Sequence, residues 1–105
     1  MIARTWHGWA SSPPDAVAYE EHFRSAVLPG LRQLRGFRGA RLLRREDGGE
    51  VEFVAVTFFD SIESVRGFAG DDYQRAVVEP EARRVLSRFD VRSAHYEVVD
   101  TWGVS

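Results

Sequence analysis

The chain has 105 residues, which is enough for one domain with a single hydrophobic core. Its formal net charge of −2 argues against a nucleic-acid surface or an anionic membrane as partner. All 14 basic residues are arginine, so no lysine can form a Schiff base, and the lack of cysteine excludes disulfides and Cys-ligated metals. No apolar run is long enough to span a membrane and no leader-like segment opens the sequence, so we expect a soluble, cytoplasmic protein.

A strand and an amphipathic helix come first. Residues 2–10 form a short aromatic-rich run that predicts a strand, and Ser12 in "SSPPD" is suited to cap the following helix. After Ala16, apolar side chains recur at every fourth position, which is typical of an amphipathic helix. These positions are Tyr19, Phe23, Val27 and Leu31. The pair Pro29-Gly30 predicts a kink or a brief break near the helix end.

Two strands joined by a tight turn follow. Residues 40–45 are rich in arginine and predict a strand at the edge of a sheet, and Gly48-Gly49 predicts a hairpin turn. Residues 51–59, "VEFVAVTFF", are apolar on both faces, so water should be excluded from both sides of this strand.

The second half predicts a helix, a helical restart and a final strand. Asp60 is the expected N-cap of the helix, with Glu63 three residues later as in a capping box. The inner face of this helix is formed by Ile62, Val65 and Phe68. Residues 71–77 predict a restart that Pro80 interrupts.

Residues 81–89 then add another helical turn or two, and residues 91–99 form the last strand.

The resulting order, β-α-β-β-α-β, predicts an α+β fold of the ferredoxin-like type, with a four-stranded antiparallel sheet and both helices on one face. We expect one domain over residues 1–100 and a C-terminal tail over 101–105. Because residues 51–59 are apolar on the helix-free face as well, we expect a second copy to cover that face in a two-fold homodimer, giving a dimeric α+β barrel.

Three stretches, "MIARTWHG", "ESVRGFAGDDYQRAVVEPE" and "HYEVV", resemble the antibiotic-biosynthesis-monooxygenase superfamily of dimeric α+β-barrel proteins. The resemblance covers about residues 1–100 and implies a pocket between helices and sheet in each protomer. Members include cofactor-independent oxygenases that convert polyketide anthrones to quinones, and heme-degrading enzymes. Other dimeric α+β barrels are polyketide cyclases and lactone isomerases.

The residues that such members use for catalysis differ in this chain. Trp6 stands where heme degraders place a catalytic asparagine, Phe68 stands where they place a tryptophan, and Val77 after Ala76 replaces their axial histidine. Anthrone oxygenases use an asparagine and a tryptophan on the second helix, where Ser64 and Phe68 stand. These differences argue against heme, and we expect no cofactor.

Two aromatic positions are candidate walls of a substrate pocket. Strand alternation places Trp6 on one face and His7 with Trp9 on the other. With the alignment above, Trp6 faces the pocket, where it and Phe68 would stack on a flat aromatic substrate, and His7 and Trp9 face the dimer seam. The alternative is that these rings only fill the core and the interface.

Four polar side chains are candidates for catalysis or substrate contact. His95 lies in the last strand, and the ordinary histidine pKa of about 6.5 suits a general base that deprotonates a phenol or a carbon beside a carbonyl. His22 lies beside small residues on the first helix, and Tyr73 and Tyr96 are candidate donors to a substrate carbonyl. The alternatives are a structural His95, a helix-edge His22 and a Tyr73 ring buried as packing.

The histidine spacing matches no metal-binding motif, and the adjacent carboxylates of Asp71 and Asp72 should point apart, so we expect no metal site. The leading hypothesis is a small tailoring enzyme, a cofactor-independent monooxygenase-like protein that acts on a flat aromatic or polyketide-type molecule. The alternatives are a polyketide cyclase or isomerase of the same fold, or a non-catalytic dimeric ligand-binding or stress-associated module.

Overall fold

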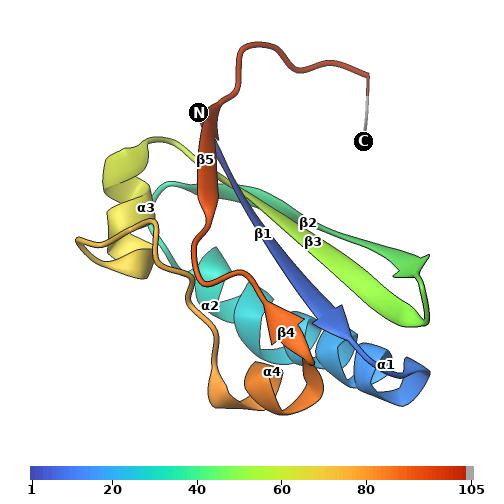
Figure 1. Cartoon of the computed structure of the whole chain (residues 1–105). Helices are drawn as coiled ribbons and strands as arrows, with labels where there is room; N and C mark the ends of the chain where they lie inside the picture. The colour runs from blue at the N-terminus through green and yellow to red at the C-terminus, as the bar shows by residue number, and fades with distance from the viewer. Residues whose placement is uncertain (104–105) are drawn as a thin grey trace.

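A computed structural model describes residues 1–103, which form one sheet with helices packed against one of its faces (Figure 1). Of the expected tail, residues 104 and 105 lie outside the described part. The elements in chain order are β1 (Ile2–Ala10), α1 (Pro13–His22), the π-helical turn η1 (Phe23–Val27), α2 (Leu28–Arg32), β2 (Phe37–Asp47), β3 (Glu50–Phe59), α3 (Ile62–Ala69), α4 (Pro80–Val85), β4 (Arg88–Phe89) and β5 (Ala94–Glu97).

The sheet is antiparallel, with strand order β2-β3-β1, and both β4 and β5 pair with the other edge of β1. β1 pairs with β3 along its whole length, from Ile2 opposite Phe59 to Ala10 opposite Val51. Figure 1 shows α1, α2 and α4 on the same side of this sheet. The predicted α+β, ferredoxin-like fold is therefore confirmed.

The first helix is capped as predicted, because the Ser12 hydroxyl accepts a backbone N–H from three residues further on. The predicted break at the proline-glycine pair is wrong, since the chain stays helical through Pro29 to Arg32. The irregularity lies one turn earlier, where the Leu28 N–H donates to the Phe23 carbonyl across a π-helical turn. The wider turn accommodates a proline ring that would clash with the carbonyl four residues before it in a regular α-helix.

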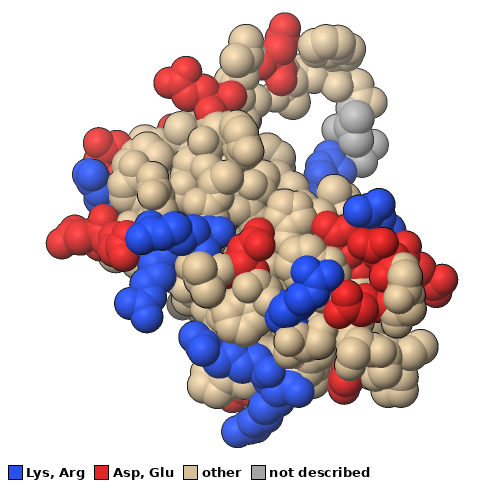
Figure 2. Space-filling model, viewed as in Figure 1, with Lys and Arg blue, Asp and Glu red and all other residues tan. Residues whose placement is uncertain are grey.

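The β2–β3 hairpin forms where the glycines predict it. Gly48 and Gly49 have φ angles of +60° and +90°, as a type I′ turn requires. β2 is an edge strand, as predicted from its arginines. On the face of the molecule seen in Figure 2, arginines and acidic side chains are interspersed, in keeping with the small net charge.

The N-cap of α3 differs from the prediction. The Ser61 hydroxyl accepts the Ser64 N–H at 3.3 Å, so Ser61 is the cap and Asp60 is not. Asp60 is held one residue outside the helix, because its N–H donates to the Gly36 carbonyl at 2.8 Å and its carboxylate accepts from Arg38. Two tertiary contacts therefore decide which of two adjacent good caps is used.

The predicted helical restart over residues 71–77 is also wrong, because the chain between α3 and α4 is a loop. Gly70 ends α3 with a φ of +86°, and the loop then pairs with residues 91–93. Pro80 does not interrupt a helix but opens α4, where its missing N–H costs nothing, and that helix runs to Val85.

Of the predicted final strand over residues 91–99, only Ala94–Glu97 forms a strand, β5. Residues 88–89, predicted as helical, form the separate short strand β4, so the described residues give a five-stranded sheet and not the predicted four-stranded one. Between these two strands the chain leaves β1 and turns toward the α3–α4 loop. The Ala76 N–H donates to the Val91 carbonyl at 2.9 Å, and the Ser93 N–H donates to the Gln74 carbonyl at 2.7 Å. The loop thus satisfies backbone groups that a continuous strand would have paired with β1.

β3 lies at the centre of the sheet and separates two different surfaces. On the helix side, Phe53 and Phe59 are 0% exposed and belong to the core. On the other side, Val54, Val56 and Phe58 are half-buried, and Figure 1 shows no helix over this face. Among the described helices, none is long and apolar enough to cross a membrane.

Candidate active site

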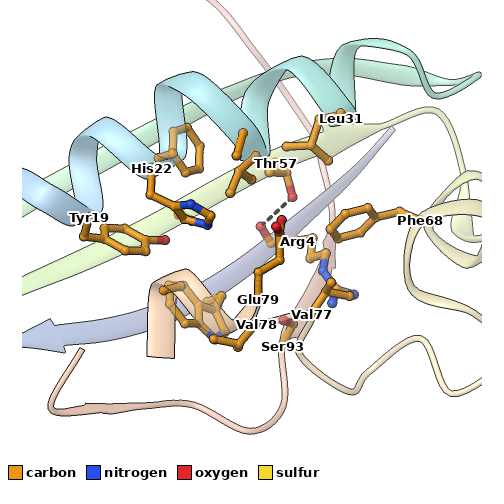
Figure 3. A pocket seen from close by; sticks show the side chains of 17 residues that line it. Arg4, Tyr19, His22, Leu31, Thr57, Phe68, Val77, Val78, Glu79 and Ser93 are labelled. Carbon is orange, nitrogen blue, oxygen red and sulfur yellow. Dashed lines mark hydrogen bonds between the residues drawn. The ribbon is translucent and has the colours of Figure 1, made fainter. Parts of the chain in front are cut away.

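A cavity of about 140 Å³ lies between the sheet and the helices that cover it. Its walls come from β1, the continuous α1–η1–α2 helix, β3, α3 and the segment that leads into α4 (Figure 3). A cavity of about 150 Å³ is known to hold one benzene ring, so this one has room for a single aromatic ring.

Trp6 forms a rigid wall of the cavity, on the face of β1 that the family resemblance assigned to the pocket. Its indole N–H donates to the Asp90 carbonyl at 2.9 Å, and its ring lies 6.1 Å from that of Tyr19. Gly8 lies beneath the ring, and a Cβ there would come within 2.6 Å of the Trp6 side chain. The hydrogen bond and this close contact hold the indole in one orientation.

Phe68 closes another side of the cavity from α3. Its ring stacks on Phe59 of the core, with centroids 6.1 Å apart. Phe23 and Leu31 contribute further apolar surface from the helical side. The cavity is therefore mostly hydrophobic, with a small number of polar groups, which is typical of small-molecule sites.

His22 is the histidine that lines this cavity, and Figure 3 shows its ring projecting into it from α1. Its Nε2 atom is buried and has no hydrogen-bond partner among the described residues. Buried polar atoms are nearly always paired, so an unpaired imidazole nitrogen at a cavity wall is a candidate ligand contact. Next to it, burial raises the pKa of the Tyr19 phenol, which keeps that hydroxyl protonated.

Arg4 reaches the cavity from β1 and is only 4% exposed. Its guanidinium donates to the Tyr73 carbonyl, to the Arg75 carbonyl at 3.1 Å and to His95 Nε2 at 2.9 Å. Since arginine has no acceptor, His95 Nε2 must be the acceptor, and the ring carries its proton on Nδ1. Burial lowers the pKa of Arg4 to about 10, so it stays charged at neutral pH.

Glu79 supplies the one carboxylate among the residues that line the cavity. It precedes α4, and Figure 3 shows its side chain extending into the cavity between His22 and Phe68. Neither Glu79 nor Arg4 was predicted from the sequence as a site residue. A signal existed for each: Pro80 at a helix start makes residue 79 the N-cap, and Arg4 shares its strand face with Trp6.

The six predicted site residues fall into two groups. Trp6, His22 and Phe68 come together at the cavity. The other three residues, Tyr73, His95 and Tyr96, border a second, more open pocket of about 410 Å³ at the β5 edge.

Within the second group, the Tyr73 and His95 rings meet edge to face at 5.1 Å. Tyr96 pairs with Ala3, so it lies on the helix-free side of the sheet. His95 contacts the cavity-lining Arg4, and its pKa is lowered by burial and, secondarily, by the Arg4 charge.

Val77, which stands where the family resemblance implied an axial histidine, lines the cavity and offers no atom that could ligate a heme iron. Among residues 1–103, no three histidine or acidic side chains are placed to hold a metal ion.

The comparisons with known proteins identify the family. Residues 11–80 match the family described as antibiotic biosynthesis monooxygenase, and the chain belongs to it. No curated protein matches the sequence.

Similar solved structures include a variant of MhuD with two manganese protoporphyrin IX molecules bound per active site. It is 21% identical, covers 99% of this chain and 100% of its own, and has a TM-score of 0.66. A variant of SnoaB, a cofactor-independent oxygenase from Streptomyces nogalater, is 15% identical over 95% of each chain, with a TM-score of 0.64.

A monooxygenase from ActVA-Orf6 of Streptomyces coelicolor, in complex with Nanaomycin D, is 12% identical. It covers 99% of this chain and 92% of its own, with a TM-score of 0.65. At these identities the likeness shows a shared fold.

Proposed function

We propose that this protein is a cofactor-independent, monooxygenase-like tailoring enzyme that acts on a small, flat aromatic molecule. The observation that carries the proposal is the unpaired Nε2 of His22 at the wall of an aromatic-lined cavity. Membership of the antibiotic biosynthesis monooxygenase family supports it, as does the likeness in fold to a cofactor-independent oxygenase.

In the proposed reaction, His22 takes the proton of a phenol, and the electron-rich phenolate then reacts directly with molecular oxygen. For a phenol with a free para position, phenol and O₂ give a para-quinone and water, so the substrate supplies all the electrons. The protein deprotonates the ring, orients it between Trp6 and Phe68 and excludes water.

His22 takes the role of general base that the sequence analysis assigned to His95. His95 Nε2 already accepts a hydrogen bond from Arg4, and the ring does not line the cavity. His22 Nε2 has no such partner among the described residues and faces the cavity.

Oxygen uptake tests the proposal, with an electron-rich monocyclic phenol as the substrate. Three variants are compared with the wild type: His22→Gln, His95→Gln and, as a control on the opposite sheet face, His7→Gln. We expect His22→Gln to lower kcat about 100-fold or more, the usual contribution of a general base, and His7→Gln to leave it unchanged. A loss of kcat in His95→Gln alone would show that His95, and not His22, is the general base.

A cyclase or isomerase is the second candidate, because deprotonation by the same base in the same cavity needs no oxygen. Product formation under nitrogen separates this activity from oxygenation. If an aromatic ring binds but no product forms under air or under nitrogen, the protein is a ligand-binding module.

We also propose that the helix-free face of the sheet pairs with a second copy of the chain. The half-buried side chains of Val54, Val56 and Phe58 support this pairing, because together they form an apolar surface on β3 that the described helices leave uncovered. Trp9 lies on the same side, where the Arg88 guanidinium stacks on its ring at 3.9 Å.

A further inference from the structure

Arg4 is a buried cation without a counter-ion. Among residues 1–103, no carboxylate lies within ion-pair distance of its guanidinium, although this side chain is 4% exposed. The arginines that form ion pairs in this structure have their own side chains at least 43% exposed, unlike Arg4. Buried charges are normally paired, so the exception calls for a partner.

The groups that hold Arg4 are neutral. Two are the backbone carbonyls of Tyr73 and Arg75, and the third is the imidazole of His95. They orient the guanidinium and satisfy three of its five N–H groups, but they do not neutralise its charge. The Phe68 ring, 5.5 Å from the guanidinium carbon, adds a weak cation–π contact from the cavity wall.

We propose that the cavity binds its aromatic ligand as an anion, with a carboxylate or phenolate oxygen facing Arg4 and the ring between Trp6 and Phe68. The inference rests on the proposed function, because it specifies the substrate class of the same cavity. The volume of about 140 Å³ has room for one ring with its acidic substituent. Because Arg4 would stabilise a phenolate, it would favour the charged product of deprotonation by His22.

Glu79 allows a second test of how charge in the cavity affects ligand binding. Its carboxylate lines the same cavity and, among residues 1–103, forms no ion pair, so it repels an anionic ligand. Glu79 is itself exposed, at the solvent side of the segment that leads into α4. Replacing it with glutamine removes the repulsion and keeps the shape of the side chain.

The test compares binding of benzoate with that of benzamide by isothermal titration calorimetry at pH about 7.5. The two probes have nearly the same shape and differ in charge. We expect the wild-type protein to bind benzoate at least 10-fold more tightly than benzamide. A parallel titration with 4-nitrophenolate and 4-nitrobenzoate shows whether a phenolate oxygen is preferred over a carboxylate.

Three variants assign the preference to a residue. Arg4→Met should abolish the preference for benzoate, and the surface control Arg32→Met, at the exposed end of α2, should preserve it. Glu79→Gln should tighten benzoate binding several-fold and leave benzamide binding unchanged. Circular dichroism checks whether Arg4→Met folds. If it does not fold, the binding of both probes by the wild type and by Glu79→Gln decides the test.

Equal binding of benzoate and benzamide by the wild type would overturn this inference and leave the proposed aromatic site standing. An unchanged preference in folded Arg4→Met would also overturn it. Failure of both probes to bind would reject the aromatic site and therefore the proposed function as well.

Discussion

Arg4 and His95 lie opposite each other in the pairing of β1 with β5, and their side chains meet on the helix side of the sheet. Burial and the neighbouring Arg4 charge both disfavour a protonated His95, which is why its pKa lies below the ordinary value. The lowered pKa makes the stability of the fold depend on pH.

We expect the free energy of unfolding to fall as the pH drops below about 6.5, the ordinary pKa of histidine. In that range the unfolded chain binds a proton at His95 more readily than the folded one, so acid favours unfolding. The stabilising effect is complete above pH about 6.5 and is lost as the pH falls toward the lower pKa of the folded state. Urea unfolding between pH about 7.5 and 5.5 measures this slope, and His95→Gln should flatten it. An equal slope in both proteins would contradict the assignment.

Gly8 provides a second prediction for a single residue. A Cβ at this position would lie 2.6 Å from the Trp6 ring and 3.2 Å from Leu86, so Gly8→Ala should cost about 1–3 kcal/mol. The matched control is Gly67→Ala, at an exposed position of α3 where the new methyl group meets open space. This change should raise the free energy of unfolding by about 0.5–1 kcal/mol. Thermal unfolding compares the two. If Gly8→Ala leaves the stability unchanged, Trp6 is not held tightly.

Part of the candidate site was predictable from sequence, because strand alternation separated Trp6 from His7 and the family resemblance placed Trp6 toward the pocket. Trp6 on β1, His22 on α1 and Phe68 on α3 all line the cavity. His95 alternates onto the helix side too, but Arg4 lies between it and the cavity. The sequence cannot show which of two side chains on the same face of the sheet lies nearer to the cavity, because that depends on how the side chains pack.

The start of α3 provides a prediction about an element. Ser61→Ala should lower the free energy of unfolding by about 1 kcal/mol, because it removes the hydroxyl that accepts the Ser64 N–H. Asp60→Ala should cost less, since it removes a surface ion pair with Arg38. Chemical denaturation measures both variants. A larger loss in Asp60→Ala would restore Asp60 as the cap.

The segment between α3 and β5 shows why local patterns fail for some elements. Residues 71–77 contain a helix-like pattern, but their backbone is paired with residues 91–93 from the far end of the chain. The same hydrogen bonds draw residues 91–93 of the predicted last strand away from β1, so that the strand begins only at Ala94. Such pairing joins residues 15 to 19 positions apart, in two segments separated by α4, so the local pattern of either segment does not reveal it.

At the scale of the whole molecule, we expect sedimentation at micromolar concentration to give a particle of twice the mass of the chain. Val56→Arg should convert it to a monomer, because it places a charge in the apolar centre of the helix-free face. The matched control is Val17→Arg on α1, where the valine is 61% exposed and lies on the helical side. A monomeric wild type, or a dimer that survives Val56→Arg, would contradict pairing through this face.

By itself the sequence determined the fold class, the hairpin at Gly48-Gly49, the edge position of β2 and the apolar character of both faces of β3. These features follow from residue type and spacing within one or two neighbouring elements. Only the tertiary structure decided that Arg4 and Glu79 share a cavity with His22. These residues come from β1, the turn before α4 and α1, and their meeting depends on how the helices pack on the sheet.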